Sequence, residues 1–187
     1  GEPDPTVATV GATNWAGGFT ATRHLIELGH RRIGVITGPP DLWCSRARMD
    51  GYRSAMDAAE LALDPELMQW SNFHVDGGFK DAMALLSLPD QPTAIFAGSD
   101  LQALGVLEAA RVQHVRVPSQ LSLVGFDDLP LSRWTSPPLT TVRQPLAEMA
   151  ATAVRLVLAQ GRGEGADKRS VELATTLVVR ETTAPCR

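Results

Sequence analysis

The chain has 187 residues, of which 44% are hydrophobic and 20% are charged, and it carries a net charge of −4. This composition excludes a disordered, collagen-like or coiled-coil protein and indicates a globular domain with a core of its own. The acidic balance, without a cluster of Lys and Arg, argues against DNA binding by this chain alone, and no apolar run is long enough to span a membrane.

Amphipathic stretches alternate with short apolar runs along the first two thirds of the chain, as expected for helices that alternate with strands. Gly29 is placed to end the first helix. The predicted elements are a helix at 14–28, a strand at 32–37, a helix at 45–59, an extended segment at 67–73, a helix at 75–86, a strand at 92–97, a helix at 100–111 and a strand at 121–126.

The apolar runs are nearly continuous, which is typical of strands buried on both faces of a parallel sheet. The sequence therefore predicts a doubly wound α/β fold with right-handed crossovers. The rhythm ends after Asp127-Asp128. The remaining predictions are a loop at 134–138, an extended piece at 140–143, a helix at 146–158, a turn at 161–165 and strands at 170–173 and 176–179.

Ligands of open α/β sheets bind beyond the carboxyl ends of the strands, so the residues that follow each strand are the candidate site. Aromatic faces, a guanidinium fork and carboxylates are the groups that recognise a polyhydroxylated ligand. Those that follow a predicted strand are Trp43, Arg46, Arg48, Phe73, Ser99, Asp100, Asp127 and Asp128.

Each of these residues also has a purely structural interpretation. Arg48 can form an ion pair with Asp100 or Asp127, Asp100 can cap a helix, and the aromatic side chains can belong to the core. Asp127 and Asp128 resemble a metal-binding pair, but no third carboxylate or His lies nearby in the sequence. We therefore expect no metal site.

Catalytic motifs are absent from the sequence. There is no GxSxG, HExxH or GxxxxGK[ST] motif, and residues 11–17 lack the GxGxxG spacing of a dinucleotide loop. Cys44 and Cys186 lie far apart and belong to no CxxC pattern. We therefore expect a protein that is not an enzyme, has no cofactor and resides in a reducing cytoplasm.

Five blocks between residues 11 and 145 resemble regulators of the LacI/GalR family. They are TRHLIELGHRRIGVITGP at 22–39, RARMDGY at 46–52, AGSDLQALG at 97–105, VP followed by LSLVGFDD at 117–128, and PPLTTVRQP at 137–145. The resemblance implies a periplasmic-binding-protein-like sensor core of two subdomains, with an effector bound between them. It also implies that DNA is contacted only through a separate N-terminal headpiece, which this sequence lacks.

The resemblance implies a division of the chain. Residues 1–29 are expected to be a remnant of the first sensor subdomain and 30–143 to form the second. Residues 144–173 then provide a crossover and a helix of the first subdomain, and 174–187 the final crossover and strand. On this division the helices at 16–28 and 146–158 would lack most of the sheet that they should cover and would expose apolar stripes.

The resemblance also implies site residues. Effector contacts are expected at Arg48, Phe73, Asp127 and Gln144, with Ser99 at a position where the family usually has Asn. Trp15 and Trp43 occupy variable, ligand-facing positions, and they favour a sugar over a purine.

The family pattern further implies a homodimer, with Leu104, Leu107 and Trp134 at its interface; the alternative is that all three are core residues. A sugar-binding protein of an ABC transporter has the same fold and is the second hypothesis. The Asp127 block and the PLTT block favour the regulator.

Overall fold

The computed structural model describes residues 7–162 and 170–186, so part of the turn predicted at 161–165 lies outside the described residues. In these ranges no helix is both long and apolar enough to cross a membrane. In chain order the elements are β1 (Thr9–Ala12), α1 (Asn14–Glu27), β2 (Ile33–Thr37), α2 (Trp43–Ala58), η1 (Pro65–Leu67), β3 (Met68–Trp70), α3 (Val75–Leu85), β4 (Ala94–Ala97), α4 (Asp100–Val112), β5 (Ser122–Asp127), η2 (Pro130–Arg133), β6 (Thr140–Arg143), α5 (Leu146–Gly161), β7 (Ser170–Leu173) and β8 (Thr176–Val178).

The larger of two sheets contains six strands in the order β3-β2-β4-β5-β6-β8. Its neighbouring strands are parallel except for β8, which runs antiparallel to β6. Every residue of β2 and β4 is buried, as the continuous apolar runs predict. The predicted doubly wound α/β fold is confirmed.

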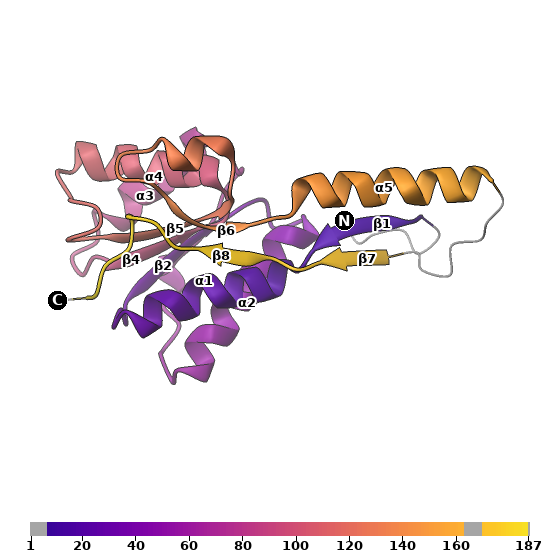
Figure 1. Cartoon of the computed structure of the whole chain (residues 1–187). Coiled ribbons are helices and arrows are strands. Elements are labelled where there is room, and N and C mark those ends of the chain that lie inside the picture. The colour runs from indigo at the N-terminus through magenta and orange to yellow at the C-terminus, as the bar shows by residue number, and fades with distance from the viewer. Residues whose placement is uncertain (1–6, 163–169, 187) are drawn as a thin grey trace.

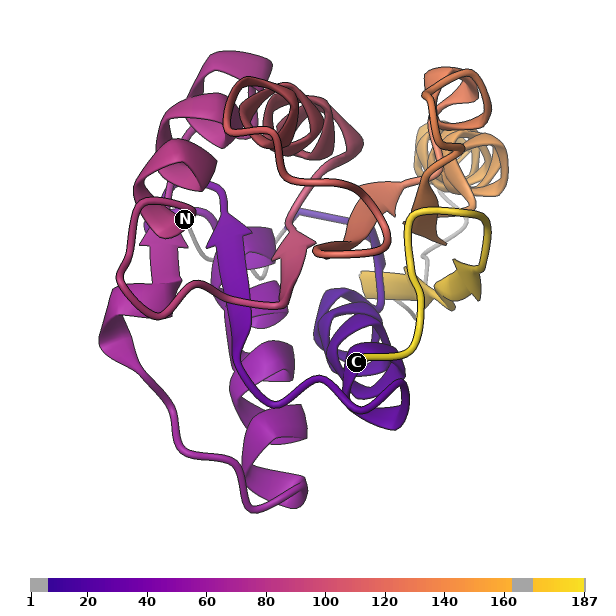
Figure 2. The same ribbon diagram turned by 90° about the vertical axis from the view of Figure 1, so that its left-hand side faces the viewer.

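Helices cover both faces of this sheet (Figures 1 and 2). On one face α1 and α2 bury Leu25 and Tyr52 against Phe126. On the other, α3 and α4 enclose a second core that includes Val106 and Ile95. Full burial of each large apolar side chain stabilises the fold by about 1.5–3 kcal/mol. The two cores therefore hold the carboxyl edge of the sheet as a rigid platform.

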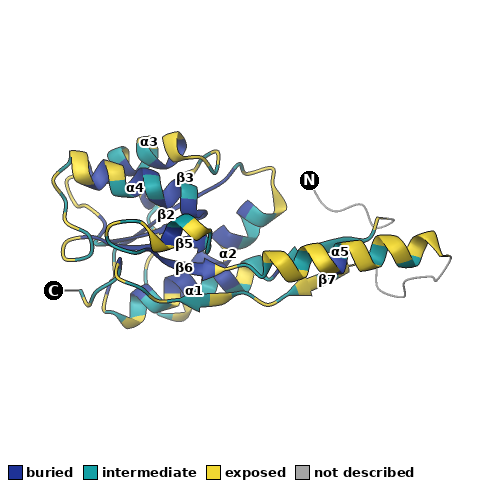
Figure 3. Cartoon of the chain, turned by 45° about the horizontal axis from the view of Figure 1, so that its top comes forward, coloured by how far each residue is buried: buried dark blue, intermediate teal, exposed yellow. Residues whose placement is uncertain are grey.

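A smaller body extends from one end of the molecule (Figure 1). Its strands β1 and β7 pair in parallel, from Thr9 opposite Ser170 to Ala12 opposite Leu173, and α5 packs along β1. β1 is not among the elements predicted from the sequence. Much of α5 is exposed (Figure 3). The expected apolar stripe on this helix is present, at Val154, Val157 and Leu158.

The resemblance placed helix α1 in the first sensor subdomain and implied that it exposes an apolar stripe. Its apolar face is buried in the larger body, with Ala21 and Leu25 fully inaccessible. Gly18 permits a close crossing with α2, since a Cβ at this position would lie 2.4 Å from the carbonyl oxygen of Arg48. The exposed apolar stripe that we expected on α1 is therefore absent.

The C-terminal residues are bound to the larger body through His30, whose side chain is buried just before β2. Its Nδ1 lies 2.9 Å from the Thr93 hydroxyl, and its Nε2 lies 2.9 Å from the Ser122 hydroxyl and 3.1 Å from the carbonyl oxygen of Ala184. Burial lowers the pKa of His30 below its ordinary value of 6.5, with the hydrogen bond to Ala184 opposing the shift.

We expect this arrangement to make stability fall on acidification. The unfolded chain binds a proton at His30 more readily, so the contribution is present above the unfolded pKa of 6.5 and is lost as the pH falls towards the folded value. Melting temperatures at about pH 7.5 and about pH 5.5 should drop more for the protein than for a His30→Gln variant. Equal drops would show that His30 is not the titrating group.

Candidate functional site

The candidate site lies at the carboxyl edge of the six-stranded sheet. There the structure brings together four of the predicted residues: Arg48 on α2, Phe73 before α3, Asp127 at the end of β5 and Gln144 after β6. Arg48 contacts both Phe73 and Asp127, and Asp127 contacts Gln144. Elements that are far apart in the sequence thus contribute their side chains to one connected cluster, the Arg48 cluster.

Arg48 is the centre of the cluster and is only 5% exposed. Its Nε donates to Oδ1 of Asn14 at 2.9 Å, and its Nη1 donates to the carbonyl oxygen of Gly98. The guanidinium lies 3.7 Å from the centroid of the Phe126 ring. Burial lowers the pKa of Arg48 and the Asp127 carboxylate opposes this, but the group remains charged at any physiological pH. Among the described residues none accepts a hydrogen bond from Nη2, which leaves that nitrogen for a ligand.

Asp127 faces the guanidinium. Its Oδ1 lies 4.0 Å from Nη1 of Arg48 and accepts a hydrogen bond of 2.6 Å from Nε2 of Gln144. Burial raises the pKa of Asp127, whereas the Arg48 charge and the Gln144 hydrogen bond oppose the rise. Its backbone has φ 118, a left-handed conformation that is rare for a residue with a side chain and is frequent at functional sites.

Phe73 is held over the end of β2 by backbone geometry. Its φ is 62, and its ring occupies the space above Gly38, where a Cβ would lie 2.1 Å from the ring. Ser99 donates from its hydroxyl to the Phe73 carbonyl at 3.0 Å and accepts from the Gln102 backbone N–H at the start of α4. Ser99 therefore caps α4 and fixes Phe73.

Asp100 is not the helix cap that the sequence suggested. Its carboxylate accepts from the Leu129 backbone N–H at 2.7 Å and from the Thr141 hydroxyl at 2.5 Å, and so ties α4 to the segments after β5 and within β6. Burial, the dominant cause, raises its pKa to about 7, against the two hydrogen bonds. Its role is to hold the platform beneath the site.

Asp128 points away from Asp127 and into a second cluster. Its carboxylate accepts from Arg180, from Nε of Arg143 at 2.6 Å and from the Ser132 hydroxyl at 3.1 Å. The two neighbouring aspartates therefore bind different partners and do not converge on a metal. Within the described residues, no group of three His, Cys, Asp or Glu side chains is arranged to hold a metal ion.

Trp15 and Trp43 are close to this cluster but are not part of it. They line a pocket of about 300 Å³ together with Asn14 and Glu172, between the start of α1, the start of α2 and strand β7. Arg48 does not line this pocket, but Asn14 does, and Asn14 bonds to Arg48. The pocket and the Arg48 cluster therefore share one side chain.

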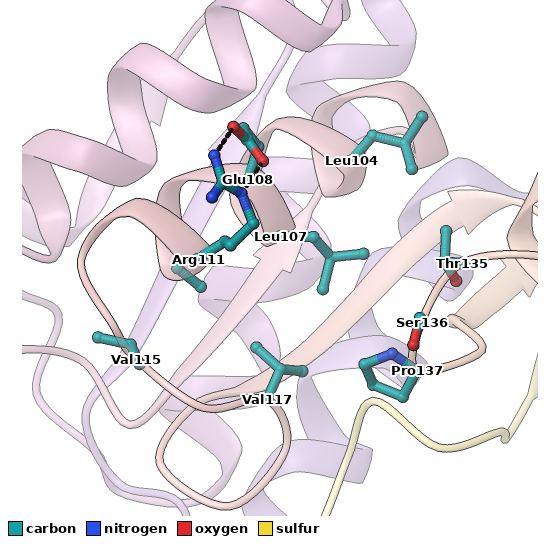
Figure 4. Close-up of a pocket in the computed structure, with 10 residues that line it drawn as sticks. Leu104, Leu107, Glu108, Arg111, Val115, Val117, Thr135, Ser136 and Pro137 are labelled. Atoms are coloured by element: carbon teal, nitrogen blue, oxygen red, sulfur yellow. Dashed lines mark hydrogen bonds and ion pairs between the residues drawn. The ribbon is translucent and has the colours of Figure 1, made fainter.

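The three residues predicted at a dimer interface lie on another face. Leu104 and Leu107 line a hollow of about 410 Å³ between α4 and the loop after η2 (Figure 4). Trp134, which precedes the lining residues Thr135 and Ser136, is 86% exposed. The alternative that Trp134 is a core residue is therefore wrong.

Asn14, Glu172 and Arg180 are among the residues of these clusters that were not identified from the sequence as site residues. Asn14 lies two residues after the end of β1, so recognition of that strand would have indicated it as a strand-end residue. Glu172 lies 158 residues beyond Asn14, and Arg180 lies 132 residues beyond Arg48. Both belong to segments whose placement depends on the tertiary fold. No local sequence signal identifies them.

Comparisons with known proteins agree with this architecture. Residues 22–183 match the family model of the periplasmic binding protein-like domain. The ribose operon repressor of Haemophilus influenzae is 39% identical over 165 residues, which cover 88% of this chain and 50% of that protein. The chain spans about half the length of the curated relatives that it matches.

Solved structures give the same result. The complex of the transcriptional regulator CelR with cellobiose is similar with a TM-score of 0.92 and 38% identity, over 97% of this chain and 56% of that one. A LacI family transcriptional regulator from Enterococcus faecium with bound ribose has a TM-score of 0.91 and 26% identity, over 100% of this chain and 69% of that one.

Proposed function

This chain belongs to the LacI family of transcriptional regulators through its periplasmic binding protein-like domain, and from that premise we propose that it senses an effector for such a regulator. The effector is a small polyhydroxylated molecule, a sugar. The observation that carries this proposal is the pairing of two buried, oppositely charged groups, Arg48 and Asp127, at the carboxyl edge of the sheet. A guanidinium donor beside a carboxylate acceptor binds vicinal hydroxyl groups through charge-assisted hydrogen bonds.

The other site residues have supporting roles. Phe73 offers a ring face to the apolar side of a sugar, and Gln144 orients the Asp127 carboxylate. Ser99 acts by holding Phe73 in place. Trp15 and Trp43 add aromatic faces beside the cluster.

The relatives support a regulator over the sugar-binding protein of an ABC transporter, since those reported above are named as a repressor and as transcriptional regulators. They equally support a binding role over an enzymatic one. The protein acts in the cytoplasm, and its DNA contacts are made by a separate N-terminal headpiece.

The two bodies fit a sensor with two states. In this proposal the larger body is the second sensor subdomain, while β1, α5 and β7 belong to the first. An effector that binds between them favours the closed arrangement, and this shift in population alters the geometry of paired headpieces.

Calorimetric titration of the purified protein with a panel of mono- and disaccharides tests the proposed function. We expect at least one sugar to bind with a Kd in the micromolar range, which corresponds to a binding free energy of about −8 kcal/mol. The same titration with adenine and guanine serves as the control. Binding of a purine and of no sugar would overturn the effector class.

We also propose that the protein is a homodimer and that Leu104, Leu107 and Trp134 lie at its interface. An 86% exposed indole is unusual on a monomeric surface, and it adjoins the 410 Å³ hollow that contains both leucines. In a two-fold symmetric pair, such a projection and such a hollow can each face its counterpart.

Substitution of this indole should weaken the dimer. Buried Trp side chains at interfaces are frequent hot spots, so Trp134→Ala should raise the dimer dissociation constant by about 30-fold. Analytical ultracentrifugation measures the change, with Trp70→Ala, which alters a Trp in a different hollow, as the control. A wild-type protein that is monomeric at micromolar concentration would contradict the interface.

A further inference from the structure

The pocket beside the Arg48 cluster continues into a second hollow. The first, of about 300 Å³, is lined by Asn14, Trp15, Trp43 and Glu172 among others. The second, of about 190 Å³, shares Asn14, Trp43 and Glu172 and runs along β1 and β7. A volume of 300 Å³ is at the lower limit of typical small-molecule sites, so the two hollows together offer room for a sugar ring.

Two tryptophans from different helices flank this space, and both remain about half exposed, Trp15 at 48% and Trp43 at 49%. Each is supported from within the protein. The Trp15 ring stacks on Phe19 with centroids 5.3 Å apart, and the Arg46 guanidinium lies 5.9 Å from the centroid of Trp43. Indoles that are fixed in this way present their apolar surface at little cost in conformational entropy.

Glu172 supplies a polar group to the same space. It is exposed on β7, and no described residue forms a hydrogen bond or an ion pair with its carboxylate. A free carboxylate between two indoles can accept hydrogen bonds from hydroxyl groups, and it disfavours an anionic ligand. Aromatic faces with a carboxylate acceptor suit a neutral sugar ring.

Asn14 lies between the Arg48 cluster and the pocket lined by Trp15 and Trp43, which we call the tryptophan pocket. Its Oδ1 accepts from Arg48, and its Nδ2 donates to the carbonyl oxygen of Ala12 at 2.9 Å. Its side chain is therefore fixed at the boundary between the Arg48 cluster and the tryptophan pocket. A sugar unit bound at Arg48 and Asp127 therefore lies next to the pocket, which has room for a second unit linked to the first.

We propose that Trp15, Trp43 and Glu172 form a subsite for a second sugar unit, so that the effector is a neutral glycoside of at least two units. This inference rests on the proposed sugar-sensing function and narrows its ligand class. The Arg48 cluster binds the first unit, and the tryptophan pocket selects for a substituent on that unit.

Calorimetry tests the subsite with cellobiose, maltose, lactose and sucrose, each compared with glucose, galactose and fructose as the component sugars. We expect one disaccharide to bind at least about tenfold more tightly than its components. Trp43→Leu and Glu172→Gln should each lower the affinity for that disaccharide by about tenfold more than they lower the affinity for its component monosaccharides. Both side chains are exposed, so an unchanged melting temperature will confirm folding, and Trp70→Leu is the matched control.

Equal affinity for a disaccharide and its components, or wild-type disaccharide affinity in both variants, would overturn the subsite and leave the proposed function intact. A protein that binds none of the seven sugars would overturn both proposals.

Discussion

Replacing Asp128 with alanine is expected to lower the free energy of unfolding by about 3–5 kcal/mol. The Asp128 side chain is only 4% exposed, and it holds the cations of Arg180 and Arg143 together with the Ser132 hydroxyl. Its removal leaves the Arg180 guanidinium, which is 14% exposed, without its carboxylate. The cost arises mainly from that uncompensated buried charge.

Urea denaturation measures this loss. Arg143→Ala is the matched control, because its side chain is 46% exposed and its removal should cost less than about 1 kcal/mol. Burial raises the pKa of Asp128, but the hydrogen bonds from Arg180 and Arg143 outweigh it and hold the pKa below its ordinary value. The contribution is therefore present above the unfolded pKa and is lost as the pH falls through the folded one. A loss below about 1 kcal/mol in Asp128→Ala would show that this carboxylate is solvated in solution.

Arg48→Ala should weaken effector binding by about 100-fold or more, since it removes charged hydrogen bonds worth about 1.5–3 kcal/mol each. It should also lower the stability of the fold. Arg48 is buried, and without it the Asp127 carboxylate, the Asn14 side chain and the Gly98 carbonyl all lose a partner.

Asp127→Asn separates the two effects. The amide oxygen can still accept from Gln144, so we expect a small change in stability and a loss of about tenfold or more in affinity. Arg48 and Asp127 act as a unit, so the double variant should lose less than the sum of the two single losses. Wild-type affinity in both single variants, by calorimetry with the best-binding sugar, would exclude this pair from the site.

Asp127 and Asp128 connect the proposed effector site with a segment near the exposed Trp134. Both have positive φ values, 118 and 55, so their side chains point to different partners from adjacent positions. One faces Arg48 and Gln144, and the other holds Ser132 on η2, the element directly before Trp134. One adjacent residue, Asp128, therefore connects Asp127 at the proposed effector site with the segment that leads to the proposed dimer interface.

The sequence predicted the sheet well because β2, β4 and β5 are buried on both faces and are therefore apolar without interruption. It missed β1, a short strand that contains Gly11. The partner of β1 is β7, which lies about 160 residues further along the chain. The exposed stripe expected on α1 was wrong, because helical periodicity identifies an apolar face but not the surface that buries it.

The site residues, like the strands, could be predicted where a local sequence pattern identifies them. Arg48, Asp127 and Gln144 lie in recognisable blocks next to strands, and Phe73 ends a predicted extended segment. The fold brings the four residues together. The partners of Asp128 and the contribution of Glu172 come from segments placed only by tertiary packing, so sequence order alone could not predict them.

The four tryptophans allow a direct test of where the effector binds. In ¹H–¹⁵N NMR spectra of the protein, titrated with the sugar that binds most tightly, we expect the Nε–H resonance of Arg48 and the indole resonances of Trp15 and Trp43 to shift. The indole of Trp70, which lines a different hollow together with Asn72 and Lys80, should not move. Shifts confined to Trp70 or Trp134, with the resonance of Arg48 unchanged at saturation, would contradict an effector site at the Arg48–Asp127 edge.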